Sequence, residues 1–332
     1  MRRKRTLGLC ILLAAGICLS GCGNKAKETK LETGDISNES VVMKVGSEPV
    51  RFSEVKDYCY FLKCQYEGSF GEQLWEYPLS KNETIGDQAK QEIVNMITQL
   101  KIICNTAKRQ NVKLTADEMD EALRKAEELV GNASKADKAE YSLNVQDISE
   151  IYQENALADK MFYIATDDAD TTVSDEEARQ MSLQYIEVMT NGTDRNGTAI
   201  QMDEQAKKKA LTRAQKLQTE AASRTDFQSF AQKNTDAANV DLTIGKDTDA
   251  LESKVVENVM AMSDGQTSDV IEGEQGYYIV HCVKATDEEA TYKKKEEIIK
   301  QRQTDMFMKK YAKWLEDQNV DINQTFWNEF SI

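Results

Sequence analysis

Apolar residues recur at three- and four-residue intervals through much of this 332-residue chain, which predicts a protein built mainly from helices. In residues 86–108, for example, Ile93, Ile97, Leu100 and Ile103 fall on one helical face. The same spacing predicts further helices over residues 53–66, 115–130, 144–164, 203–222 and 291–318.

Shorter apolar runs predict a few strands. Residues 41–45 and 50–52 flank a turn that contains glycine, and residues 184–189 and 276–283 are rich in β-branched and aromatic side chains. Helical segments precede and follow the last two strands, so the simplest architecture is an inserted domain. We therefore predict an α+β fold with a helix-rich domain over residues 41–180, a small α/β domain over residues 181–286, and a C-terminal helix over residues 287–332 that returns to the first domain.

The first 40 residues have the pattern of an export signal followed by a tether. Basic residues 2–5 precede an apolar run, and Leu19-Ser20-Gly21-Cys22 resembles the lipobox of bacterial lipoproteins. The apolar run, residues 7–19, falls short of the roughly 20 residues that span a bilayer. We predict a signal peptide over residues 1–21, lipidation of Cys22, and a flexible polar tether over residues 22–40. The expected location is extracytoplasmic, lipid-anchored to the bacterial cell membrane.

Charge and composition exclude several classes of function. A formal net charge of −15 argues against binding to nucleic acid and to anionic lipid headgroups, so membrane attachment must come from the acyl chains. The single histidine, His281, cannot supply a multi-histidine metal site, and its strand context is unusual for a catalyst. We expect no metal and no cofactor. The cysteines at 59, 64, 104 and 282 are expected to be buried free thiols, or else to form a bridge between distant segments.

Several short segments within residues 182–285 resemble the parvulin domain. They are Thr225-Asp226-Phe227 with the following Phe230-Ala231-Gln232-Lys233, Asp241-Leu242, Gly265-Gln266-Thr267-Ser268, and Gly276-Tyr277 with Ile279-Val280. Together with the lipobox and the flanking helices, they make the chain similar to the parvulin-type extracytoplasmic foldase lipoproteins, a peptidyl-prolyl isomerase and chaperone family. This resemblance implies a small domain with a four-stranded sheet and helices, placed within a chaperone-like helical domain.

The resemblance also implies that the parvulin domain is degenerate. Tyr185 and Tyr278 occupy the positions of the family histidines, and the family acid or cysteine falls near Ala237. The substrate-proline pocket falls on Leu251, Val255 and Met260. Packing is the alternative for all of them: the tyrosines as core aromatics on neighbouring strands, and the three apolar residues as core or as an apolar groove for client segments.

The function implied by the resemblance is a membrane-anchored foldase or chaperone that assists the folding of exported proteins, with weak or absent peptidyl-prolyl isomerase activity. The alternatives are an active isomerase, a structural or assembly lipoprotein, and a solute-binding lipoprotein. The expected partners are unfolded or partly folded exported proteins and the membrane, reached through acyl chains on Cys22. The oligomeric state is open, with a homodimer as one alternative.

Overall fold

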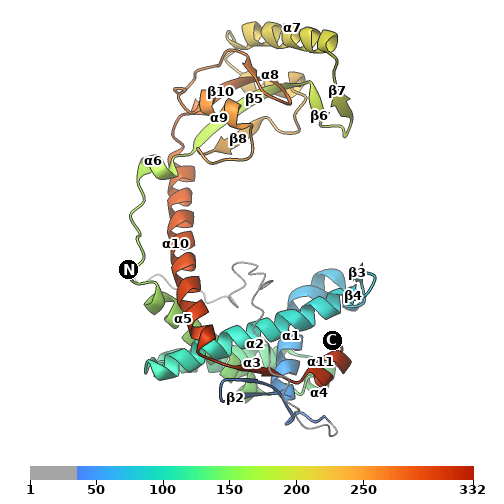
Figure 1. The fold of residues 1–332 in the computed structure, drawn as a ribbon, viewed down its shortest axis with the longest axis vertical. Coiled ribbons are helices and arrows are strands. Elements are labelled where there is room, and N and C mark those ends of the chain that lie inside the picture. Colours follow the sequence, from blue (N-terminus) through green and yellow to red (C-terminus); the bar gives the residue numbers. More distant parts are fainter. Residues whose placement is uncertain (1–35) are drawn as a thin grey trace. The chain divides into compact units, whose positions relative to one another are not determined.

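The computed structural model describes residues 36–332, which divide into two compact units (Figure 1). The helical unit contains the described residues up to Asp168 together with Asp305–Ile332, and the sheet unit contains Ala169–Thr304. The predicted lipidation site Cys22 and the predicted signal peptide lie outside the described residues. Within residues 36–332, every helix is too short or too polar to span a bilayer.

The helical unit is built around a small antiparallel sheet and five helices from the N-terminal part of the chain. Its N-terminal elements are β1 (Val41–Val45), β2 (Glu48–Arg51), α1 (Phe52–Phe70), a 3-10 turn (Glu72–Leu74), β3 (Pro78–Ser80), β4 (Glu83–Thr84), α2 (Ile85–Arg109), α3 (Ala116–Asn132), α4 (Lys135–Glu140) and α5 (Val145–Ala165). The C-terminal part of α10 (Glu288–Glu316), β11 (Val320–Ile322) and α11 (Gln324–Glu329) complete it. Strand β1 lies between β2 and β11, so residues from both ends of the described chain share one sheet.

The core of this unit forms on the apolar face of α2, where Ile93, Ile97 and Ile103 are fully buried. The C-terminal part of α10 contributes Phe307, whose ring centroid lies 5.2 Å from that of Phe162 on α5. Capping boxes begin α2 and α3, with a threonine hydroxyl accepting from the third helical N–H at each start. Each cap of this kind stabilises a helix by about 1 kcal/mol.

The sheet unit is built on a four-stranded antiparallel sheet of order β8-β5-β10-β9. Its elements are α6 (Asp175–Ala178), β5 (Met181–Met189), β6 (Asn191–Thr193), β7 (Ala199–Gln201), α7 (Glu204–Ala221), α8 (Phe227–Asn234), β8 (Asp241–Ile244), α9 (Ser253–Val259), β9 (Ile271–Glu272), β10 (Gly276–Lys284) and the first part of α10. Because side chains alternate along a strand, the two central strands β5 and β10 supply both faces of the sheet with apolar residues.

Two separate apolar clusters cover the two faces of this sheet. On one face, Tyr278 and Val280 pack with residues of α9. On the other face, Tyr277 and Ile279 pack with α7 and α8. The continuous apolar run of β10 in the sequence follows from this burial on both sides.

The α+β prediction is confirmed, and the small unit has the expected four-stranded sheet. Helix α1 begins at Phe52, one residue before the predicted range, and has no side-chain cap. Its first turn is bonded to the preceding segment, with the N–H of Phe52 donating to the Ser40 carbonyl and that of Ser53 to the Asn38 carbonyl. All four cysteines of the described residues are free, and Cys64 is exposed rather than buried.

Candidate functional site

Tyr185 and Tyr278 lie on the same face of the two central strands of the sheet unit. Strand register places Tyr278 opposite Glu187 and Val280 opposite Tyr185. The two tyrosines are therefore diagonal neighbours in adjacent residue pairs on this face of the sheet. Tyr278 is buried and Tyr185 is half-buried against the same apolar cluster. The structure therefore brings together the two residues that the resemblance assigns to the family histidine positions.

The hydroxyl of Tyr278 bonds two carboxyl groups rather than Tyr185. Its oxygen lies 2.8 Å from Oε1 of Glu187 and 2.8 Å from Oε1 of Glu252. Within residues 36–332, the hydrogen bonds of the Tyr278 hydroxyl go to these two carboxyl groups and do not include Tyr185. The reason is register, since Glu187 faces Tyr278 directly across the two strands.

Glu252 is the member of this group that carries the charge. It directly precedes α9, and Oε1 accepts the N–H of Gln275 at 2.9 Å, while Oε2 accepts the N–H of Glu274. Burial alone would raise the pKa of Glu252, but these two N–H groups and the Tyr278 hydroxyl lower it below its ordinary value. An ionised carboxylate therefore holds the turn between β9 and β10.

Glu187 has the opposite tendency. It is buried on β5, and this burial raises the pKa of its carboxyl group. The hydrogen bond from Tyr278 lowers that pKa and the nearby Glu252 raises it, and the net shift is upward. A phenol has a single proton, so Tyr278 can donate to only one of its two carboxyl partners. The lowered pKa of Glu252 and the raised pKa of Glu187 favour Glu252 as the ionised acceptor of the Tyr278 proton. The buried group is then a short chain of three polar side chains.

Leu251, Val255 and Met260 join the same apolar cluster as the two tyrosines. Leu251 and Val255 are buried, whereas Met260 keeps a partly exposed side chain. A fully buried Val255 presents no surface to a ligand, so the packing alternative accounts for it directly. Of the three residues predicted for a substrate pocket, Met260 is the one with accessible surface, and the pocket itself stays a prediction.

His281 lies on the opposite face of the sheet from Tyr278. Its ring stacks on Phe227 with centroids 5.0 Å apart, and Nδ1 lies 2.9 Å from Oγ1 of Thr267. Burial lowers the pKa of the imidazole, so it is neutral at neutral pH. These contacts give His281 a packing role, separate from the tyrosines.

The loop that carries Ala237 is bonded to β5 at Glu187. The N–H of Glu187 donates to Oγ1 of Thr235 at 3.0 Å, and the N–H of Asp236 donates to the Glu187 carbonyl at 2.9 Å. The resemblance places the family acid or cysteine near Ala237, whose methyl group is buried, while Glu187 brings a carboxyl group to this region of the sheet.

Sequence reasoning missed both carboxyl groups that bond Tyr278. A signal existed for Glu187, because an acidic residue between Ile186 and Val188 in an apolar strand is unusual and needs a partner. No local signal existed for Glu252, which reaches Tyr278 only through the fold, over 26 residues of sequence.

Comparison with known proteins finds one family model that matches part of the chain. Residues 173–298 match the PPIC-type PPIASE domain, a peptidyl-prolyl isomerase domain. The foldase protein PrsA of Staphylococcus aureus (strain bovine RF122 / ET3-1) is 22% identical over 316 residues, which cover 93% of this chain and 83% of that protein. The matched segment 173–298 includes all four strands of the sheet and both carboxyl partners of Tyr278.

The solved structures that match this chain include two foldase proteins PrsA. That of Lactococcus lactis is 16% identical, covers 87% of this chain and 97% of its own, and has a TM-score of 0.34. That of Streptococcus pneumoniae str. Canada MDR_19A is 18% identical, covers 76% of this chain and 88% of its own, and has a TM-score of 0.32.

Proposed function

We propose that this chain is a foldase. It acts as a chaperone for exported proteins and has little or no isomerase activity of its own, although its residues 173–298 match the PPIC-type isomerase domain. The observation that carries the proposal is the Glu187–Tyr278–Glu252 group, which includes the tyrosine that the resemblance assigns to a family histidine position. Similarity to the S. aureus foldase protein PrsA over most of both chains supports the foldase role.

The physical argument concerns what prolyl isomerisation needs. Rotation about a peptide bond has a barrier of about 18–20 kcal/mol, and an enzyme lowers it by binding the twisted amide better than the planar one. That requires an apolar pocket for the proline ring and a polar group free to act near the rotating carbonyl. The Tyr278 hydroxyl is buried and engaged by two carboxyl groups, so it is poorly placed to serve a substrate.

Two assays separate the chaperone from the enzyme. We expect the protein to suppress aggregation of a denatured client while its turnover of a proline tetrapeptide stays near the uncatalysed rate. Tyr278→Phe should leave both results unchanged, as should Tyr292→Phe, a control at an exposed tyrosine of α10. Turnover well above background that Tyr278→Phe or Tyr185→Phe reduces, and Tyr292→Phe does not, would establish an active isomerase instead.

Membrane attachment through Cys22 is the second part of the proposal, and the lipobox supports it. Two or more acyl chains anchor a protein stably, because each buried CH₂ contributes about 0.8 kcal/mol. In bacteria supplied with an alkyne fatty acid, we expect the protein to be labelled and Cys22→Ala to lose at least about tenfold of the label. Cys64→Ala, at an exposed cysteine of α1, is the matched control and should keep it. Equal labelling of the two variants would contradict lipidation at Cys22.

A further inference from the structure

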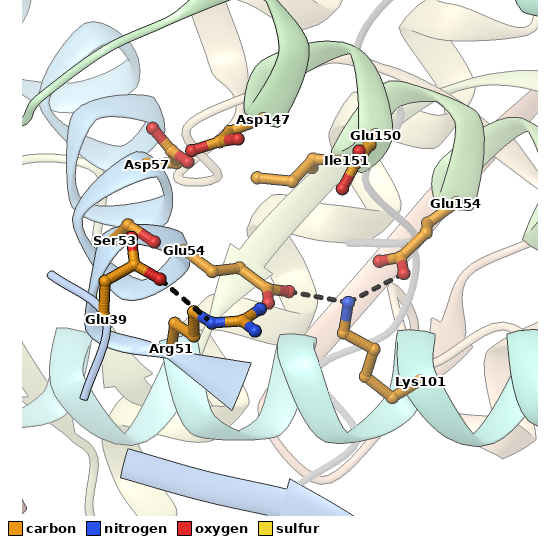
Figure 2. Close-up of a pocket in the computed structure, with 10 residues that line it drawn as sticks. All are labelled: Glu39, Arg51, Ser53, Glu54, Asp57, Lys101, Asp147, Glu150, Ile151 and Glu154. Atoms are coloured by element: carbon orange, nitrogen blue, oxygen red, sulfur yellow. Dashed lines mark hydrogen bonds and ion pairs between the residues drawn. The ribbon is translucent and has the colours of Figure 1, made fainter. Parts of the chain in front are cut away.

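A second polar site lies in the helical unit, in a cavity of about 170 Å³ between α1, α2 and α5 (Figure 2). Its lining is almost entirely charged and consists of Glu39, Arg51, Ser53, Glu54, Asp57, Lys101, Asp147, Glu150, Ile151 and Glu154. Glu39, Arg51 and Glu150 are exposed at its rim, so the cavity is open to solvent. Six carboxyl groups face two basic groups there, and the site is therefore strongly negative.

One end of the cavity already holds an ammonium group. Nζ of Lys101, on α2, lies 2.8 Å from Oε1 of Glu54 on α1 and 2.7 Å from Oε1 of Glu154 on α5. Figure 2 shows this lysine between the two carboxylates. Carboxylates of α1 and α5 thus already bind one primary ammonium group together, that of Lys101.

A second pair of carboxyl groups from the same two helices has no such cation. Asp57 lies one helical turn after Glu54 on α1, and Asp147 lies two turns before Glu154 on α5. Asp57 is only 1% exposed, and its Oδ2 has no hydrogen-bond partner. Among the ion pairs of residues 36–332, none involves Asp57 or Asp147. A buried, unpartnered acid that lines an open cavity is costly to keep, which points to a ligand.

The chemistry of the cavity favours an organic cation over a metal ion. In the described part of the chain, no three acidic, cysteine or histidine side chains converge closely enough to hold a metal. The cavity is also about ten times larger than the roughly 10–15 Å³ that a single water needs. It has room for the end of a side chain, with Ile151 as an apolar contact for a methylene stem.

We propose that this cavity binds the primary ammonium group of a lysine side chain in an extended client segment, between Asp57 and Asp147. The identity of the ligand as a client rests on the proposed chaperone function, whereas the cation chemistry does not. An unfolded client exposes its lysines, and the net charge of −15 attracts cationic segments over distance. Ion pairs with two carboxylates then hold the ammonium group, as ion pairs with Glu54 and Glu154 hold Lys101.

Binding should be coupled to loss of a proton from the site. Burial, with Asp147 and Glu54 nearby, raises the pKa of Asp57 to about 8, so at pH 7 the empty site keeps a proton that the ligand's charge displaces. Affinity should therefore rise as the pH increases from 6 to 8. The charged groups that face Asp57 around the cavity are Glu54 of its own helix, Asp147, Glu150 and Glu154 of α5, Lys101 of α2, and Glu39 and Arg51 at the rim.

The test compares two short, unstructured, end-blocked peptides that differ only in a central lysine or norleucine. By calorimetry with the full chain at pH 8, we expect the lysine peptide to bind at least about tenfold more tightly than the norleucine peptide. Asp57→Asn should abolish this preference, and Asp120→Asn, the same charge change at an exposed position of α3, should keep it. At pH 7, calorimetry in two buffers of different ionisation enthalpy should detect proton release with the native chain only.

Several outcomes would overturn the proposal. One is a lysine preference that survives Asp57→Asn, or that is lost equally in Asp120→Asn, because the net charge alone would then explain it. Another is Ca²⁺ binding that depends on Asp57 without any preference for lysine, which would assign the cavity to an inorganic cation. Suppression of client aggregation without lysine preference would refute this site and leave the proposed function standing. A lysine preference that depends on Asp57, without suppression of client aggregation, would support the site and refute the chaperone role.

Discussion

Asp57→Asn is expected to stabilise the helical unit at alkaline pH by about 2–4 kcal/mol, an unusual direction for a change at a buried residue. The pKa of Asp57 is raised from 3.8 to about 8 in the folded protein, first by burial and then by Asp147 and Glu54. One pKa unit corresponds to about 1.4 kcal/mol, so the shift sets a ceiling of about 6 kcal/mol. Local relaxation and water penetration reduce this to the smaller figure. Asparagine keeps the shape of the side chain and removes the charge.

The pH dependence of this gain follows from proton linkage. Between pH 4 and pH 8 the folded protein holds a proton on Asp57 that the unfolded chain has released, so stability falls as the pH rises through this interval. The gain from Asp57→Asn should be near zero at pH 4, grow up to about pH 8, and then level off. All three tryptophans, Trp75, Trp314 and Trp327, lie in the helical unit, so their fluorescence reports its unfolding in denaturant.

The difference between variant and parent isolates Asp57 from the other groups that titrate around it. Asp120→Asn is again the matched control and should change stability by less than about 0.5 kcal/mol at every pH, because Asp120 is exposed. A stabilisation by Asp57→Asn that is the same at pH 4 and pH 9 would contradict a buried carboxyl with a raised pKa. This prediction is independent of any ligand.

The fold was predictable where local sequence determines structure. Helix α2 has an apolar face with regular spacing, and β10 is a continuous apolar run, so both were placed within a few residues. Strand β11 and helix α11 were not foreseen, since β11 has only three residues and forms because β1 offers it an edge. Short elements of this kind depend on partners that are distant in sequence.

The candidate sites were predictable to a smaller extent. The resemblance to the parvulin-type foldases is confirmed, and it placed Tyr185 and Tyr278 on neighbouring strands. It gave no information about Glu252, whose role depends on the turn between β9 and β10. The acidic cavity had no sequence signal either, because Asp57 and Asp147 are 90 residues apart and ordinary in their local context. Only the packing of α1 against α5 brings them to one cavity.

Lys101→Met is expected to destabilise the helical unit by about 3–5 kcal/mol, the largest loss among the changes considered. Nζ of Lys101 contacts Glu54 and Glu154 within 2.8 Å, and its side chain is 13% exposed. Methionine keeps most of the apolar stem and removes the charge, so two largely buried carboxylates lose their common cation. Burial already raises the pKa of Glu54, with Lys101 opposing that effect. The measurement is denaturant unfolding at pH 7, followed by tryptophan fluorescence.

The same helix supplies the control for this prediction. Nζ of Lys108 lies 2.8 Å from Oε1 of Glu48, but both side chains are exposed, so Lys108→Met should cost less than about 1 kcal/mol. Adding Glu54→Gln to Lys101→Met should recover part of the loss, because it removes one of the two unpaired charges. Equal effects of the two lysine variants, or no recovery in the double variant, would show that Lys101 acts through its stem. In that case the carboxylates of α1 and α5 would not need a cation to remain buried, and the argument for a ligand at Asp57 would weaken with it.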